Sequence, residues 1–137
     1  MINIIVVTHG DFGAYLIEAA EEIVGPQDCG VRCVSISARL SIDEVRERLS
    51  SAVADLETAD GVVVAVDMPG GTPGNVAMPL ARSRCKIGVV SGVNLYMLVT
   101  AFNYRSGATL EELVERMVAA GKKSISDMKS MFLARRA

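Results

Sequence analysis

Four short apolar runs, separated by segments with helical periodicity, constrain the fold of this chain more than any other feature. The runs are Ile2–Val7, Val31–Ile36, Gly61–Val66 and Lys86–Val90. The first and third are continuous and rich in β-branched residues, which is typical of central parallel strands that are covered on both faces. Strands that alternate with helices predict a parallel α/β sheet with right-handed crossovers.

The segments between the runs carry helical patterns and helix start signals. Ser41 can cap a helix while Glu44 reaches back to the cap amide, and Thr109 and Glu112 repeat this capping box. The apolar residues expected on the buried sides of three helices are Leu16, Ala19, Ala20, Ile23 and Val24; Ile42, Val45, Leu49, Val53 and Leu56; and Leu110, Leu113, Val114, Met117 and Val118.

We therefore predict a single domain over residues 1–137, with a three-layer, doubly wound, mainly parallel sheet and helices on both faces. The tail allows two structures. Ile125, Met128 and Phe132 suit a helix, but Gly121 could equally end the preceding helix and release an antiparallel edge segment. We expect Met117, Met128 and Met131 to lie in the core or in a dimer interface.

Composition excludes several classes of protein. Of the 137 residues, 50% are apolar and only 4% are aromatic, so the core must be aliphatic. A net charge of -2 leaves no basic stripe, so we expect no nucleic-acid partner. Three cysteines are an odd number, which argues against a disulfide framework and for small buried residues of a reduced protein.

No apolar stretch approaches the roughly 20 residues of a membrane span, and the N-terminus is typical of a strand rather than a signal peptide. We therefore expect a cytoplasmic protein without direct membrane insertion.

Chemistry is expected at the carboxyl ends of the strands, because ligands of doubly wound sheets bind where the strand order reverses. Residues 8–13, 67–73 and 91–94 follow the first, third and fourth runs. The first and third strands are neighbours in the common arrangements, which would bring His9 and Asp67 together.

His9 is the only histidine of the chain. A lone histidine is often structural or merely exposed, and an aspartate after a strand is often a turn residue. As a pair, His9 and Asp67 favour a functional role over a structural one. If Asp67 accepts a hydrogen bond from one ring nitrogen, the other nitrogen keeps a free lone pair, as a phosphoryl-accepting imidazole requires.

The segment Gly70-Gly71-Thr72-Pro73 is the most specific element. Thr72 suits a helix N-cap and Pro73 suits the first helical position. A glycine-rich turn before a helix N-terminus is a ready anion site, although an ordinary loop that needs positive φ competes with this interpretation.

An anion site, a carboxylate and a histidine in one cleft predict phosphoryl transfer, with His9, Asp67 and Thr72 as catalytic residues. The phosphate-binding residues would be Gly10, Asp11, Gly70 and Gly71, with amides near Gly10 and Gly71 directed at the phosphoryl oxygens. There is no Walker A sequence, no dinucleotide fingerprint and no metal-ligand cluster, so we expect no cofactor and no metal.

Three motifs resemble one family. The run IIVVTHGDFG resembles the phosphorylation-site segment of mannose/fructose-type enzyme IIA proteins of the bacterial sugar phosphotransferase system. VDMPGGTPGNVA and SGVNLYML resemble the second and third signatures of this family, in the same order along the chain.

The resemblance implies that His9 accepts phosphate from the phosphocarrier protein HPr and passes it to a IIB component during sugar uptake. It implies that Asp67 orients His9, that Thr72 is the active-site hydroxyl, and that homodimers exchange an edge strand near the C-terminus. We also expect the IIB acceptor to be a separate polypeptide.

Three alternatives remain open from the sequence. A regulatory phosphoprotein would use the same histidine, and the phosphocarrier subunit of dihydroxyacetone kinase shares the fold. A flavodoxin-like cofactor module would need aromatic stacking, for which the chain offers three tyrosines, three phenylalanines and no tryptophan.

Overall fold

The computed structural model of the chain describes residues 1–68, 72–83 and 86–136. In this part of the chain, four parallel strands form one sheet in the order β2-β1-β3-β4. The strands are β1 (Asn3–His9), β2 (Val31–Ile36), β3 (Val62–Val66) and β4 (Ile87–Val90). The doubly wound parallel fold is thus confirmed, and β1 lies beside β3 as predicted.

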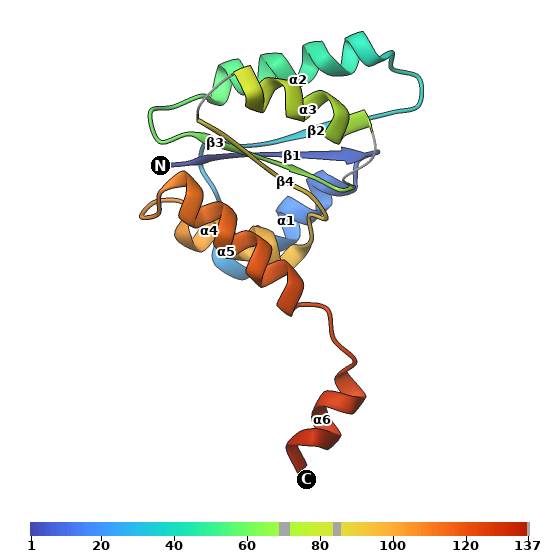
Figure 1. Cartoon of the computed structure of the whole chain (residues 1–137), viewed down its shortest axis with the longest axis vertical. Coiled ribbons are helices and arrows are strands. Elements are labelled where there is room, and N and C mark those ends of the chain that lie inside the picture. The colour runs from blue at the N-terminus through green and yellow to red at the C-terminus, as the bar shows by residue number, and fades with distance from the viewer. Residues whose placement is uncertain (69–71, 84–85, 137) are drawn as a thin grey trace.

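Helices cover both faces of this sheet and make three layers (Figure 1). One face carries α2 and α3, and the other carries α1, α4 and α5. The helices are α1 (Phe12–Val24), α2 (Ile42–Leu56), α3 (Thr72–Ser83), α4 (Leu95–Tyr104), α5 (Leu110–Lys123) and α6 (Met128–Arg136).

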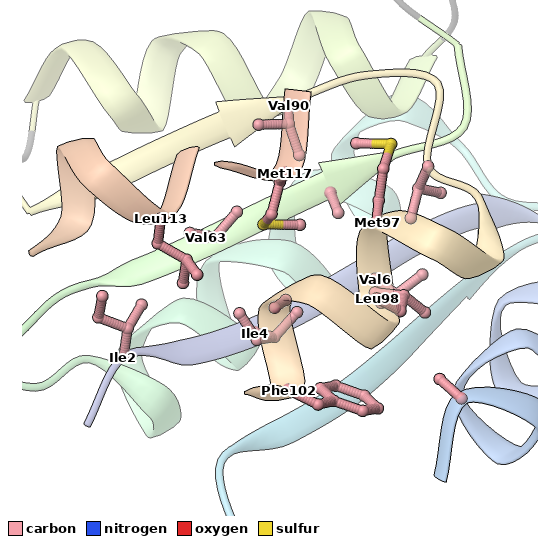
Figure 2. Packing of buried hydrophobic residues seen from close by; sticks show 14 of the residues in the cluster. Ile2, Ile4, Val6, Val63, Val90, Met97, Leu98, Phe102, Leu113 and Met117 are labelled. Atoms are coloured by element: carbon pink, nitrogen blue, oxygen red, sulfur yellow. The ribbon is translucent and has the colours of Figure 1, made fainter. Parts of the chain in front are cut away.

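The alternation of side chains along the strands gives the sheet two cores. In β1, Ile4 and Val6 pack toward α1, α4 and α5, whereas Ile5 and Val7 pack toward α2 and α3. Figure 2 shows the first of these cores, where Leu98 of α4 and Leu113 of α5 cover the strand residues. Because β1 is buried on both faces, its end is held rigidly, and that end carries His9.

Helix starts follow the predicted capping residues. Ser41 accepts a hydrogen bond from the Glu44 amide, and Thr109 and Glu112 form both halves of a capping box. The helix α3 begins at Thr72, one residue earlier than the N-cap assignment placed it. The buried side of α1 differs from the predicted one. Gly13, Ile17 and Ala20 are buried, whereas Ile23, which was expected on the buried side, is 61% exposed.

The C-terminal tail is helical in the described residues. Helix α5 continues through Gly121, and after a short turn Asp127 caps α6 by accepting hydrogen bonds from the Ser130 amide and hydroxyl. Figure 1 shows α6 extending away from the body of the domain. Between the two structures that the sequence allowed, the tail therefore adopts the helix, and an exchanged edge strand is not confirmed.

Two of the cysteines can be placed. Cys29 is exposed, which contradicts the expectation of a buried residue, because it lies in the turn before β2. Cys33 is half-buried on β2, and burial raises the pKa of its thiol. Cys85 lies outside the described residues. Within residues 1–68, 72–83 and 86–136, no helix is long and apolar enough to cross a bilayer.

Candidate active site

The parallel register of β1 and β3 places the two central residues of the site side by side. Val7 pairs with Val66, so the chain after β3 leaves the sheet next to the last residues of β1. The amide of Asp67 continues this ladder by donating to the carbonyl of Val7 at 3.2 Å. His9 is the last residue of β1, and its side chain is 48% exposed.

One carboxylate oxygen of Asp67 holds His9 at two points. The backbone amide of His9 donates to Asp67 Oδ2 at 2.9 Å, and ring atom Nδ1 lies 2.8 Å from the same oxygen. The Asp67 side chain is only 10% exposed, whereas the imidazole is half-exposed. The ring is therefore held at Nδ1 and still open to solvent.

The charge of Asp67 decides which ring nitrogen of His9 donates to it. Burial by itself would raise the pKa of the Asp67 carboxyl. Hydrogen bonds from the amide and ring of His9, and the Coulomb attraction of the His9 side chain, outweigh burial and hold this pKa below its ordinary value. An ionised carboxylate only accepts hydrogen bonds, so Nδ1 is the nitrogen that donates to it, and in the neutral ring the lone pair is then on Nε2. This is the arrangement that a nucleophilic histidine requires.

In the turn after His9, the amide of Gly10 already has a hydrogen-bond partner. Gly10 has a φ of 68°, a conformation that favours glycine, and its amide donates to the carbonyl of Ile36 at 2.8 Å. This amide is occupied and cannot bind a phosphoryl oxygen in the conformation described. The predicted contribution of amides near Gly10 therefore does not come from the Gly10 amide in this conformation, because its acceptor lies on β2, which is distant in the sequence.

A cleft of about 480 Å³ opens beside the imidazole on the face of the sheet that carries α2 and α3. It brings His9 and Gly10 together with Thr72, the first residue of α3. Among the described residues, the lining is formed by His9, Gly10, Ile36, Ser37, Ala38, Leu40, Ile42, Val45 and Thr72. The predicted hydroxyl therefore shares a cleft with the predicted nucleophile.

The other predicted site residues lie elsewhere. Asp11 is the exposed N-cap residue of α1 and makes no side-chain capping bond; it is not part of the cleft lining. Gly70 and Gly71 lie outside the described residues. In the part of the chain that is described, no three His, Cys, Asp or Glu side chains gather in a way that could hold a metal ion.

The loop after β2 forms a wall of the site that the sequence analysis missed. Residues 36–40 supply four of the cleft-lining residues, and the exposed Arg39 lies between two of them. The Arg39 amide donates to Ser37 Oγ at 3.3 Å. The signal for this wall is the strand order, because the end of β2 must lie next to the end of β1 in a 2-1-3-4 sheet.

Comparisons with known proteins identify the family of this chain. A sequence model of the family described as "PTS system fructose IIA component" matches residues 3–118. The chain is 28% identical over 124 residues to the fructose-specific EIIA component of the PTS system from Bacillus subtilis, covering 90% of this chain and 84% of that protein. A crystal structure of the phosphotransferase system component EIIA from Streptococcus agalactiae matches with a TM-score of 0.85 and 32% identity, over 95% of this chain and 99% of that chain.

The chain is also 29% identical over 130 residues to the mannose-specific EIIAB component of the PTS system from Escherichia coli K12. This match covers 94% of the chain but only 40% of the longer relative. The chain therefore belongs to the mannose/fructose-type IIA components of the sugar phosphotransferase system, a family of phosphotransferase-type proteins.

Proposed function

We propose that this protein is a phosphoryl carrier, which accepts phosphate from phospho-HPr on His9 and passes it to a IIB component during sugar uptake. The observation that carries the proposal is the contact of 2.8 Å between His9 Nδ1 and Asp67 Oδ2 at the edge of an open cleft. It leaves Nε2 as the accessible nucleophile.

In the proposed step, the Nε2 lone pair attacks phosphorus while the bond between phosphorus and nitrogen in the donor breaks. The donor imidazole leaves with that electron pair. The His9 ring becomes more positive as Nε2 forms its new bond, and the carboxylate of Asp67 stabilises this charge through Nδ1–H. The reverse sequence delivers the phosphoryl group to the acceptor.

We assign the phosphoryl oxygens to the start of α3. Thr72 shares the cleft with His9, and its hydroxyl can donate to a phosphoryl oxygen. The first turn of a helix also carries amides without intrahelical partners, and the helix dipole favours negative charge there. We keep Gly70 and Gly71 in this assignment on the sequence pattern alone.

The rim of the site suits protein partners. Three large apolar side chains are exposed here. Phe12 is the first residue of α1, Ile42 is the first residue of α2, and Met68 directly follows Asp67. Arg39 adds a positive charge on the loop after β2. Exposed apolar side chains beside a nucleophile fit docking by HPr and a IIB component better than entry of a small free substrate.

We further propose that residues 1–137 form a single IIA domain, which works in the cytoplasm as a homodimer. Support for the dimer comes from α6, a helix of nine residues that carries the exposed side chains of Met128 and Met131. Isolated helices of this length are marginal in water, so packing against a second copy would stabilise it.

Phosphorus NMR tests the assignment to the ring nitrogen. After incubation with phosphoenolpyruvate, enzyme I and HPr, the protein should give a single signal with the shift of an Nε2-phosphorylated imidazole. A signal from Nδ1-phosphohistidine would contradict the role given to Asp67. A signal from a phosphate ester would contradict the role given to His9.

A further inference from the structure

Thr8 is a fully buried polar residue inside the apolar strand β1. Its exposed fraction is 0%, and only Asn3 and Arg105 are also buried polar or charged residues in the described chain. Thr8 points to the face of the sheet that carries α1, and its neighbour His9 points to the opposite face. Thr8 therefore cannot touch a ligand in the cleft.

The hydroxyl of Thr8 makes two hydrogen bonds inside the turn that follows His9. It donates to the carbonyl of Gly10 at 3.0 Å and accepts from the amide of Gly13 at 3.1 Å. The Gly10 amide is bound to Ile36, so both polar backbone groups of Gly10 have partners. Together these bonds fix the direction in which the chain leaves His9.

Gly13 leaves room for this hydroxyl. A Cβ atom at position 13 would lie 2.7 Å from Thr8 Oγ1 and 3.0 Å from both Thr8 Cγ2 and Cys33 Sγ. A side chain at Gly13 would therefore push the hydroxyl away from its partners. The first turn of α1 is closely fitted to Thr8.

We infer that Thr8 is a positioning residue for phosphoryl transfer: its hydroxyl holds the turn after His9 so that Nδ1 stays on Asp67. This inference rests on the proposed function of His9. The imidazole is half-exposed, and within the described parts of the chain it has one polar side-chain contact, so its orientation depends on the backbone on both sides of it. Asp67 holds the backbone amide of His9, and Thr8 holds the carbonyl of the next residue, Gly10.

Thr8→Val tests the hydroxyl, because valine keeps the shape and removes both hydrogen bonds. We expect the rate of phosphate acceptance to fall by roughly 10- to 100-fold, the scale of loss that small misplacements of a reacting group cause. The apparent KM for phospho-HPr should not change, because Thr8 is buried and does not contact a partner. Thr8→Ser should restore most of the rate.

Two further variants complete the set. Gly13→Ala should lose rate as Thr8→Val does, even though alanine favours a helix over glycine. Thr58→Val is the matched control, because Thr58 also donates to backbone carbonyls but lies in the turn before β3, at the other end of the strands. It should accept phosphate at the rate of the unaltered protein.

The ring nitrogens of His9 give a readout that needs no donor. The chain has one histidine, so a ¹⁵N spectrum at about pH 8 reports on this imidazole alone. The unaltered protein and Thr8→Ser should show protonated Nδ1, whereas Thr8→Val and Gly13→Ala should move toward a mixture of tautomers.

The outcomes separate the two claims. If the unaltered protein accepts no phosphate from phospho-HPr, the proposed function fails, and the ring spectra still decide the role of Thr8. Wild-type ring shifts in Thr8→Val and Gly13→Ala would overturn the inference, and so would a Thr8→Ser variant as impaired as Thr8→Val.

Discussion

At the scale of single residues, Asp67 contacts both the backbone and the ring of His9. One oxygen accepts hydrogen bonds from the backbone and from the ring, so the carboxylate and imidazole act as a unit. Asp67 Oδ1 is buried and has no hydrogen-bond partner among the described residues. Most of the interaction therefore passes through one atom, and removing its charge should affect the ring directly.

Asp67→Asn should lower the rate of phosphate acceptance by roughly 10²-fold, because the amide no longer selects the tautomer with protonated Nδ1. Rapid-quench measurements with phospho-HPr would determine the rate. Asp55→Asn is the control, because Asp55 forms an exposed ion pair with Arg32. Equal rates for the two variants would show that Asp67 is only a turn residue.

The contact between Asp67 and His9 should make the unfolding free energy of the protein depend on pH in the acid range. The pKa of Asp67 is lowered in the folded state, so its contribution is complete above the unfolded value of about 3.9 and is lost as the pH falls through the folded value. Chemical denaturation from pH 6 downward should show the unfolding free energy decreasing more for the unaltered protein than for Asp67→Asn. Parallel curves would contradict the lowered pKa.

The sequence could predict the meeting of His9 and Asp67 because both follow strands whose pairing is common in parallel sheets. It could not predict that the Gly10 amide is occupied, because the acceptor is the carbonyl of Ile36 on another strand. For the same reason, the wall formed by the loop after β2 was missed. These contacts depend on strand order, which local patterns do not encode.

At the scale of secondary-structure elements, helix starts were predictable wherever side chains cap the helix locally. The capping box at Thr109 is complete, whereas at Ser41 only the bond from the Glu44 amide to the Ser41 hydroxyl is present. Both involve residues three positions apart. The buried side of α1 was less predictable. Gly13 and Ile17 are buried because they pack closely on β1, whereas Ile23 lies outside that contact. Tertiary packing therefore decides which apolar residues of a helix are buried.

Thr109→Ala should destabilise the protein by about 1 kcal/mol, because the first turn of α5 loses the acceptor for the Glu112 amide. We expect the melting temperature to fall by roughly 3–5 °C. Phosphate acceptance should be unchanged at a temperature where the variant is folded. A loss of acceptance without a loss of stability would contradict a purely structural role for this cap.

At the scale of the whole molecule, the tail is the part that the sequence predicted least. Its apolar residues fit a helix or an edge segment, and the choice depends on whether α5 continues through Gly121. It does continue, and a Cβ at Gly121 would lie 2.8 Å from the Met97 side chain of α4. Met117 is buried in the core, whereas Met128 is 73% exposed, so of these two methionines only the one on α6 is available to the proposed second copy.

The proposed homodimer can be tested through this helix. We expect sedimentation equilibrium to give twice the mass of one chain, and the double variant Met128→Asp/Met131→Asp to shift the equilibrium toward one chain. Lys129→Asp is the control in the same exposed helix, and it should stay dimeric. A monomeric unaltered protein, or a double variant that stays dimeric, would contradict this role of α6.

The central claim, that His9 carries the phosphate, is tested most directly by intact-mass spectrometry at alkaline pH. The protein and His9→Ala are each incubated with phosphoenolpyruvate, enzyme I and HPr. We expect a gain of one phosphate in the unaltered protein and none in His9→Ala. A phosphate on His9→Ala, or no gain in the unaltered protein while HPr itself is phosphorylated, would contradict it.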